Sequence, residues 1–299
     1  MTREPALALI IGLLGGPGGL IAQQPLGPLT TEEGSPLQRL SYTPMTEPPE
    51  VVGSGRFRAD LWLGYSNIFE QDSSATHVVM MDLERLITAL TARWGVSERL
   101  EVGGRLTVET TGPGFLDSFV LWYHDALGFG QANRDRFPSG RYEQRLSDGE
   151  RPLLAMDSRR LALEDVRLFA KWRALASRDG RSALGLKLEA RVPTYENRVG
   201  AERSDLALLA LGRLGAGPWY LHGMLSVATA RSSPELEPVM RDASYGLMLA
   251  LERPLGSRLS LLLQYQLATS VLRDFHDREL DGPARNVLIG LAGRAGDDW

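Results

Sequence analysis

Apolar and polar residues alternate along most of the chain from Arg56 onward. In the first stretch, 56–65, apolar side chains occupy the odd positions and mostly polar ones the even positions. A period of two places alternate side chains on opposite faces of a β-strand. The same period recurs in nine later stretches: 86–94, 100–109, 167–173, 184–192, 205–213, 219–227, 245–252, 259–267 and 286–294. The pattern predicts about ten strands, each near the roughly 9–11 residues of a tilted membrane-crossing strand.

The second stretch is less regular than the others. It can begin as early as Thr76, and its alternation changes phase between Asp82 and Arg85. We expect a β-bulge at this point. The irregular region could instead hide an extra pair of strands, so twelve strands is the alternative. Either count is even, as the known bacterial single-chain barrels require.

Short and long connections alternate between the expected strands. The short ones are 95–98, 177–181, 215–218 and 254–257, and the long ones are 66–75, 110–160, 195–203, 231–241 and 270–283. Membrane barrels have short turns on one side of the membrane and longer loops on the other. The rhythm therefore favours an antiparallel transmembrane β-barrel.

Aromatic residues support the same interpretation. Trp94, Trp172 and Trp219 carry the apolar phase of their strands, and all three lie near short connections, as does Phe57. Membrane barrels carry such aromatic girdles at the lipid–water interface. A soluble β-sandwich, in which these residues would fill a core, also alternates and is the competing interpretation.

The connection from Thr110 to Arg160 is too long for a plain loop. Phe115, Phe119, Trp122, Ala126 and Phe129 recur at helical spacing around the stretch 116–127, which predicts a short helix. One interpretation is a cap over the barrel mouth formed by the helix with Phe115, Phe119, Trp122 and His124; the other is an outer loop that packs on itself. The polar tail of the loop, 131–160, is expected to be mobile.

The first 54 residues do not follow the strand pattern. Arg3, an apolar run from Ala6 to Leu14 and a Gly/Pro-rich break at 15–19 predict a signal peptide, 1–22, cleaved after Ala22. A buried N-terminal helix is the alternative. Residues 23–54 are rich in Pro, Gly, Ser, Thr and Glu, so we expect an irregular segment that tucks into or beneath the barrel. Residues 55–299 form the expected barrel domain.

The polar phase of the strands faces the expected lumen and is rich in charge. Eleven inward positions are basic: Arg56, Arg58, Arg93, Arg105, Arg167, Lys171, Arg173, Lys187, Arg191, Arg213 and Arg294. Seven are acidic: Asp60, Glu101, Glu109, Asp165, Glu189, Asp205 and Glu252. Such charges would be prohibitive in a soluble core, whereas in a lumen they can pair or meet water.

From this set we select candidate lumen and solute-binding residues. They are Arg58, Arg105, Arg167, Lys171, Lys187, Arg191, Arg213, Glu101, Glu189 and His222. Because a ten-stranded barrel is narrow, the same charges could instead close the lumen by pairing with one another.

Composition excludes several other classes of function. A formal net charge of −4 argues against a nucleic-acid partner. The chain has no cysteine, and its four histidines fall on separate elements, so we expect no metal site and no cofactor. His222 and Ser226 share a strand face, but at roughly 3.3 Å per residue they are about 13 Å apart, too far for a nucleophile–base pair. We therefore expect no catalytic residues and no enzyme activity.

Several short motifs resemble a known family. They are Phe115-Leu116-Asp117, the run from Trp122 to Phe129, Leu163-Glu164-Asp165-Val166, Leu186-Lys187 and Val192-Pro193-Thr194. They are similar to the bacterial outer-membrane family called the domain of unknown function 3187, over roughly Leu37 to the end. The chain departs from the family at 200–205, where the family pattern has a turn richer in Gly and Ser. The resemblance implies an exported outer-membrane barrel and implies no activity.

These observations lead to two functional hypotheses. The first is a channel or transporter that passes a small solute through a basic lumen capped by the loop helix. The second is a closed structural or surface-interaction barrel without transport. Both place the chain in the outer membrane with lipid as a partner. Both also expect recognition of the C-terminal strand, which ends in Trp299, by the barrel-assembly machinery.

Overall fold

The computed structural model describes residues 25–32, 36–40, 42–73, 77–131, 133–149, 151–155, 157–193, 204–230, 234, 236–273 and 281–294. The signal peptide predicted at 1–22 and the C-terminal end at Trp299 lie outside these ranges. Within them, no helix is both long and apolar enough to cross a membrane.

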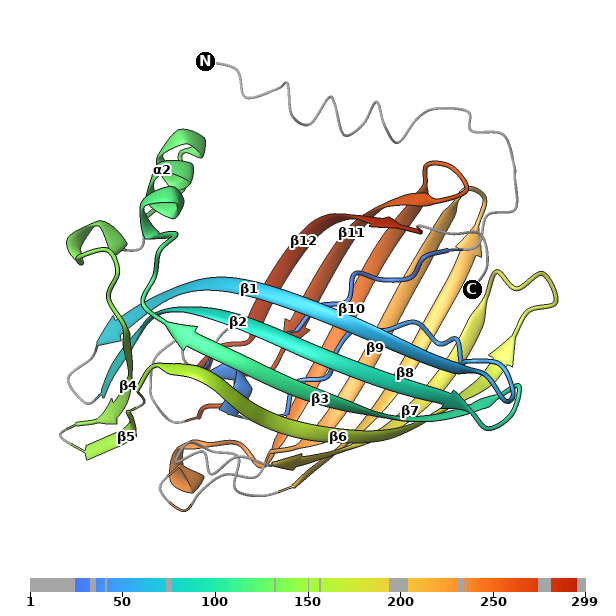
Figure 1. The fold of residues 1–299 in the computed structure, drawn as a ribbon, viewed down its shortest axis with the longest axis horizontal. Helices are drawn as coiled ribbons and strands as arrows, with labels where there is room; N and C mark the ends of the chain where they lie inside the picture. Colours follow the sequence, from blue (N-terminus) through green and yellow to red (C-terminus); the bar gives the residue numbers. More distant parts are fainter. Residues whose placement is uncertain are drawn as a thin grey trace.

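The described residues form one antiparallel sheet that curls around a lumen (Figure 1). Its strands are β1 (Phe57–Ser73), β2 (His77–Gly95), β3 (Leu100–Gly112), β4 (Glu143–Asp148), β5 (Arg151–Ala155), β6 (Arg159–Ala176), β7 (Ala183–Pro193), β8 (Asp205–Ala216), β9 (Trp219–Thr229), β10 (Ala243–Pro254), β11 (Leu259–Ala268) and β12 (Ala284–Gly293). The helical pieces are η1 (Gln38–Leu40), α2 (Asp117–Leu127), η2 (Arg134–Arg136) and η3 (Glu237–Val239).

Ten of the twelve strands form the curved wall, and they coincide with the ten predicted from the alternation. In order around the wall they are β12, β11, β10, β9, β8, β7, β6, β3, β2 and β1. The other two, β4 and β5, form a hairpin that continues the sheet beyond β3 along β2. Within the described residues β1 pairs with β2 alone and β12 with β11 alone, so the wall is a half-barrel with two free edges.

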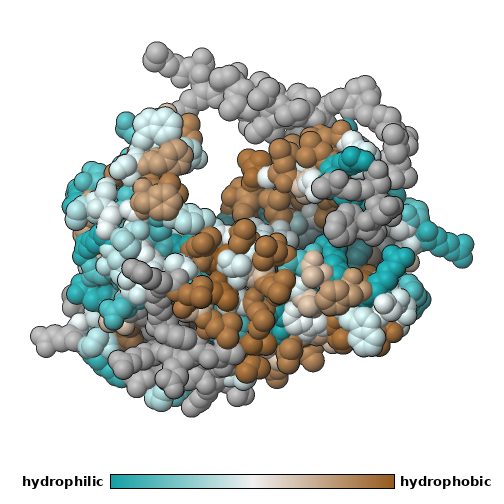
Figure 2. Space-filling view, viewed as in Figure 1, coloured by the Kyte–Doolittle hydropathy of each residue, from teal (hydrophilic) through white to brown (hydrophobic). Residues whose placement is uncertain are grey.

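The outward face of the wall is apolar on every strand. Each wall strand exposes at least one large aliphatic side chain: Leu61, Leu90, Leu106, Leu168, Leu188, Leu208, Leu225, Leu249, Leu263 and Ile289. These residues are 44–66% exposed. The register joins neighbours across strands, for example Leu61 with Leu90 and Leu90 with Leu106. Figure 2 shows hydrophobic side chains gathered over the middle of the visible face, with hydrophilic residues toward its two ends.

Strands β1 and β2 extend well past the stretches predicted for them. Their pairing runs without interruption from Phe57 opposite Trp94 to Ser73 opposite Val78. The predictions of a long loop at 66–75 and of a β-bulge near Asp82 are therefore wrong. The alternation of faces is continuous, but on β2 the apolar residues change sides. Leu86 is the last exposed residue of the outward series, whereas Leu83, Met81 and Val79 are apolar and buried on the inner side.

An apolar cluster causes this change of side. At the long-loop end, inward residues of β2 pack with the β4–β5 hairpin, two loops and the segment before β1. The buried members are Leu37, Leu40, Val79, Met81, Leu83, Leu146, Leu153, Leu154, Leu236, Met240, Val271 and Leu272. We call this set the mouth cluster. The polar tail 131–160, predicted to be mobile, contains η2 and the β4–β5 hairpin. Leu146, Leu153 and Leu154 fix that hairpin in the mouth cluster.

Candidate functional site: the charged lumen

The segment that precedes β1 lies along the inner face of the wall. We call its described residues 25–32, 36–40 and 42–53 the N-terminal segment. Its backbone contacts strands far apart in the sheet. The Leu26 N–H donates to Glu252 of β10 (2.8 Å), and the Val52 N–H donates to Glu101 of β3 (2.7 Å). Between them, the Thr30 carbonyl accepts from Trp62 Nε1 of β1 (3.1 Å). The segment therefore crosses the lumen from one side of the sheet to the other.

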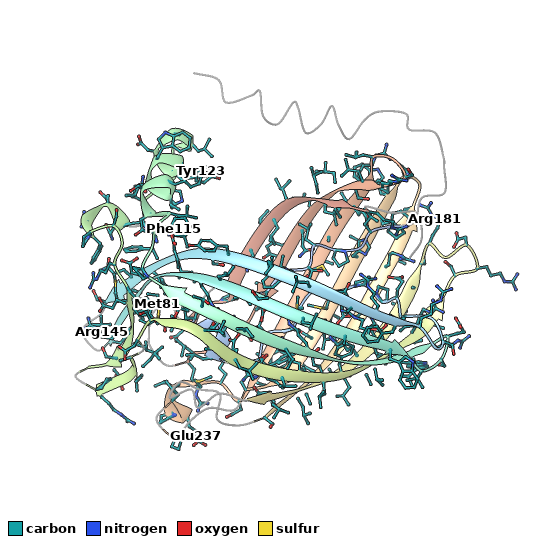
Figure 3. All side chains as sticks on the ribbon, in the orientation of Figure 1. Met81, Phe115, Tyr123, Arg145, Arg181 and Glu237 are labelled. Atoms are coloured by element: carbon teal, nitrogen blue, oxygen red, sulfur yellow. The ribbon has the colours of Figure 1, made fainter. Side chains whose placement is uncertain are left out.

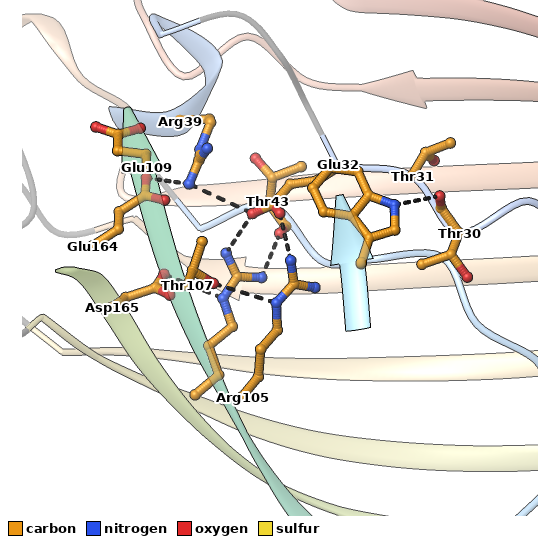
Figure 4. A network of polar contacts seen from close by, with 12 residues as sticks. Thr30, Thr31, Glu32, Arg39, Thr43, Arg105, Thr107, Glu109, Glu164 and Asp165 are labelled. Carbon is orange, nitrogen blue, oxygen red and sulfur yellow. Dashed lines mark hydrogen bonds and ion pairs between the residues drawn. The ribbon is translucent and has the colours of Figure 1, made fainter. Parts of the chain in front are cut away.

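Glu32 is the centre of one buried ion-pair cluster (Figure 4). Its carboxylate lies 2.6 Å from Arg105 and 3.2 Å from Arg167, and Arg39 of the same segment lies 3.5 Å away. The Glu32 side chain is only 1% exposed. Arg39 also pairs with Glu164, so the segment supplies both signs of charge to the network.

Glu47 is the centre of a second cluster, nearer the short turns. Its two oxygens lie 2.5 Å from Lys187 Nζ and 3.0 Å from Lys171 Nζ, and Arg93 lies 3.9 Å away. Lys171 is also 3.0 Å from Glu101. Nearby, the Tyr42 hydroxyl donates to Glu189 (2.5 Å). The two lysines of the chain are thus both held by one carboxylate of the segment.

The network sets the charge state of the two segment carboxylates. Burial alone would raise the pKa of Glu32 and Glu47. The surrounding cations outweigh this effect and hold the pKa of each below its ordinary value of 4.5: Arg39, Arg167 and Arg105 for Glu32, and Lys171 and Lys187 for Glu47. Both carboxylates are therefore ionised at neutral pH, and the segment is held by full charges.

The other predicted lumen residues also find partners. Arg191 pairs with Asp205, His222 lies 2.8 Å from Glu252, and Arg213 lies 2.6 Å from Glu50 of the segment. Of the ten candidates, nine are buried on the inner side. Arg58 is the exception, because it lies on the free-edge strand β1 with a side chain 58% exposed and pairs with Asp60 at 2.7 Å. In the described parts of the chain, no three His, Asp or Glu side chains form a group that could hold a metal ion.

A cavity of about 940 Å³ remains between the segment and the wall. It lies toward the short turns, since its lining includes Gly180, Arg181, Arg173 and Arg294. Ten of the lining residues are Arg or Lys and six are Asp or Glu, so basic side chains predominate. At the other end, the mouth cluster closes the lumen with apolar side chains.

The predicted cap helix is present as α2, but it begins on the outer side of the wall. Glu84, an outward residue of β2, accepts the Leu116 N–H at 2.5 Å, and Asn67 of β1 donates to Asp117 at 2.8 Å. Phe115 is 75% exposed and Trp122 is 64% exposed, and Phe119 is also exposed, while His124 Nδ1 contacts the Gly130 carbonyl at 3.1 Å. The N-terminal segment, and not the helix, therefore lies in the lumen.

Sequence reasoning missed the most connected residues of the site, Glu32, Glu47 and Tyr42. They lie in a stretch with no periodicity, and η1 is its one regular element among the described residues. A signal was nevertheless present. The inward positions carry more bases than acids, and buried charges need partners. The missing partners of the inward basic residues therefore had to be acidic residues from outside the strands.

Three comparisons with known proteins complete the description. The model of the family DUF3187, described as a protein of unknown function, matches residues 21–299. Among the curated proteins, none matches the chain significantly. Among solved structures, the crystal structure of an outer membrane channel from Pseudomonas putida F1 is similar at 15% identity, over 74% of each chain, with a TM-score of 0.43.

Proposed function

We propose that this chain, which belongs to the DUF3187 family, is an outer-membrane barrel that passes a small anionic solute and is closed at rest by its N-terminal segment. Three features support this proposal. They are the apolar outer face of the wall, the ion pairs between the segment and the lumen, and the basic side chains that remain in the lumen when the segment moves away.

The outer face fits a bilayer better than water. Soluble monomers rarely expose a continuous apolar patch larger than a few hundred Å². Here exposed Leu and Ile residues continue across all ten wall strands, while charged residues of the wall are buried on the inner face, beside an apolar cluster on β8 to β10. Outer-membrane barrels have apolar side chains on their outward face and polar side chains on their inward face. Trp94 and Phe57, paired in register at the short-turn end, fit an interfacial girdle.

The ion pairs of Glu32 and Glu47 are the observation that carries the functional proposal. A segment with no regular structure of its own pays a large entropy cost to lie still in a lumen. Here that cost is offset by buried charge-assisted contacts to β3, β6 and β7. These contacts can be exchanged for water and a solute anion, unlike an apolar core. Such a segment is suited to closing a pore reversibly.

The charge of the emptied lumen indicates the solute class. If the segment moves away, it takes Glu32, Glu47 and Glu50 with it. The side chains that they neutralise, above all Arg105, Lys187 and Arg213, then face water. An open lumen would therefore be positive, and a positive pore concentrates anions.

The mouth cluster favours a second candidate, a barrel that stays closed and serves a structural or surface role. Leu37 and Leu40 of the N-terminal segment belong to that cluster, so apolar burial also opposes release of the segment. The two candidates differ in one measurable property, which is conductance.

The deciding experiment is planar-bilayer recording of the full chain and the variant Glu32→Gln/Glu47→Gln. The control is Asp125→Asn/Glu237→Gln, which removes two exposed carboxylates outside the lumen. We expect rare openings for the wild-type chain and the control, and frequent anion-selective openings for the lumen variant. Silent membranes with all three correctly folded proteins would support the closed barrel, and cation-selective openings would refute the assigned solute class.

A further inference from the structure

The aromatic face of α2 remains unexplained by a lumen function. Six large apolar side chains in and beside this helix are exposed: Phe115, Phe119, Trp122, Tyr123, Leu127 and Phe129. The four that lie within the helix recur at spacings of three and four residues, so they share one side of it. Among the helix residues, the one classed as buried is Asp117, at the base.

The base of the helix is fixed to the wall at a defined height. Glu84 accepts the Leu116 N–H, and Asn67 bridges Glu84 and Asp117 with contacts of 2.9 and 2.8 Å. Asp117 also accepts a hydrogen bond from the Gly140 N–H at 2.8 Å, which joins the later part of the loop to the base of the helix. These anchors lie on the outward face directly beyond Leu86, where the outward positions change from apolar to polar.

Aromatic side chains contact one another at the base of the helix and again along it. Phe115 contacts Tyr65 of β1, with ring centroids 5.6 Å apart. Along the helix, Phe119 lies 5.7 Å from Trp122 and 6.3 Å from Tyr123, which lies 5.8 Å from Phe129. Tyr65 is the last large apolar residue of β1 that is exposed on the outward face, so this contact lies at the edge of the exposed belt.

The direction of the helix fits this position. Figure 1 shows α2 standing away from β1 and crossing the direction of that strand, and Figure 3 shows Phe115 near the wall and Tyr123 farther out. A helix that leaves the wall at the edge of the apolar belt and runs outward lies alongside a membrane surface rather than above the pore.

We propose that α2 is an interfacial anchor whose aromatic face inserts between the lipids at the long-loop surface of the same membrane. This inference rests on the proposed membrane location of the barrel. Tyr and Trp side chains are favoured at this depth because one end of each ring system is polar and the other apolar. The helix has no Lys or Arg, so its attachment depends on apolar burial rather than on lipid charge.

The absence of native cysteine makes the test direct, since one introduced cysteine can carry a fluorescent label. The reporter is Phe119→Cys, and the matched control on the opposite side of the helix is Asp125→Cys. Leu90→Cys, on the outward face of β2, reports on the wall itself. Each full-length variant is reconstituted in phosphatidylethanolamine–phosphatidylglycerol vesicles. It is then quenched with aqueous iodide or with lipids that carry a nitroxide near the headgroup or near the chain end.

The expected result is a graded order of depth. The label at position 119 should be quenched most by the shallow nitroxide, the label at position 90 most by the deep nitroxide, and the label at position 125 several-fold more by iodide than either. Equal iodide quenching at 119 and 125, with position 90 in lipid, would overturn the anchor alone. Protection of position 119 from every quencher would also overturn it, because a second protein copy would then cover the face. Iodide access at position 90 would overturn the membrane barrel itself.

Discussion

Replacing Glu47 with glutamine perturbs the closure of the lumen with almost no change in shape. Glu47 lies within 3.0 Å of two lysine ammonium groups that are both buried. At an effective dielectric constant of about 20, one such contact at 3 Å has a gross Coulomb energy of roughly 5 kcal/mol. The net cost of the substitution is smaller, because Lys171 keeps Glu101 and Lys187 keeps Glu189.

Breaking a buried pair by removing one partner typically costs about 3–5 kcal/mol. We take the lower end, about 3 kcal/mol, since each lysine retains an acid. Because each 1.4 kcal/mol is a factor of ten, this loss corresponds to roughly a hundredfold increase in the ratio of open to closed barrels. Single-channel recording of Glu47→Gln should therefore show a large increase in open probability.

A compensating variant separates loss of the ion pair from general damage. Glu47→Gln with Lys187→Gln removes both members of the 2.5 Å pair, so no additional uncompensated charge remains at that pair. We expect this double variant to recover part of the closed population. An open probability equal to that of the wild-type chain for Glu47→Gln, with the heat-modifiable gel mobility of a folded barrel retained, would refute the assignment of Glu47 as a closing contact.

Three further results are expected. The pKa of Glu32 and that of Glu47 are lowered from 4.5, so the contacts of these two carboxylates should be complete above about pH 4.5 and weaken as the pH falls further; an open probability that is equal at pH 5 and pH 3 would contradict this. Leu83→Ala in the mouth cluster should cost about 2–5 kcal/mol and lower the temperature of unfolding. Leu63→Ala on the exposed face should have a much smaller effect in detergent. Gly95→Ala would place a Cβ against the backbone carbonyls of Val52 and Gly53, so it should displace the end of the N-terminal segment and raise open probability.

The wall could be predicted from the sequence because each wall strand has an apolar outward face, and on most strands the inward positions include polar residues. The inner face of β8 is an exception, since Leu209 and Leu211 are buried there in an apolar cluster with Tyr42. Leu184, Leu186 and Leu188 expose their side chains while Lys187 and Glu189 are buried, as the alternation requires. The β4–β5 hairpin could not be predicted in this way. It is short, and its buried residues Leu146, Leu153 and Leu154 do not alternate evenly because the pairing shifts register after Leu146.

The sequence predicts the side chains that the wall contributes to the candidate site, but not the partners that the N-terminal segment contributes. The inward basic side chains follow from strand phase alone, and Arg105, Arg167, Lys171 and Lys187 are buried on the inner side as expected. Their partners do not follow from any local pattern. Glu47 and Lys171 are 124 positions apart, and Leu26 and Glu252 are 226 apart. Contacts over such separations depend on the curvature of the whole sheet, which no short stretch of sequence encodes.

The change of apolar face on β2 connects the membrane edge to the closure of the lumen. Outward from the wall, the polar residues Asn67 and Glu84 begin where Tyr65 and Leu86 end, so this level marks the edge of the lipid-facing belt. On the inner side, the apolar mouth cluster begins one step later, at Leu83. In the proposed membrane position, the mouth cluster therefore lies outside the membrane, where loops can rearrange. The ion pairs of the N-terminal segment lie within the membrane, where an uncompensated charge is costly. Opening of the proposed channel thus requires both the mouth cluster and the ion pairs to separate, and the charged contacts are the ones that a solute anion can replace.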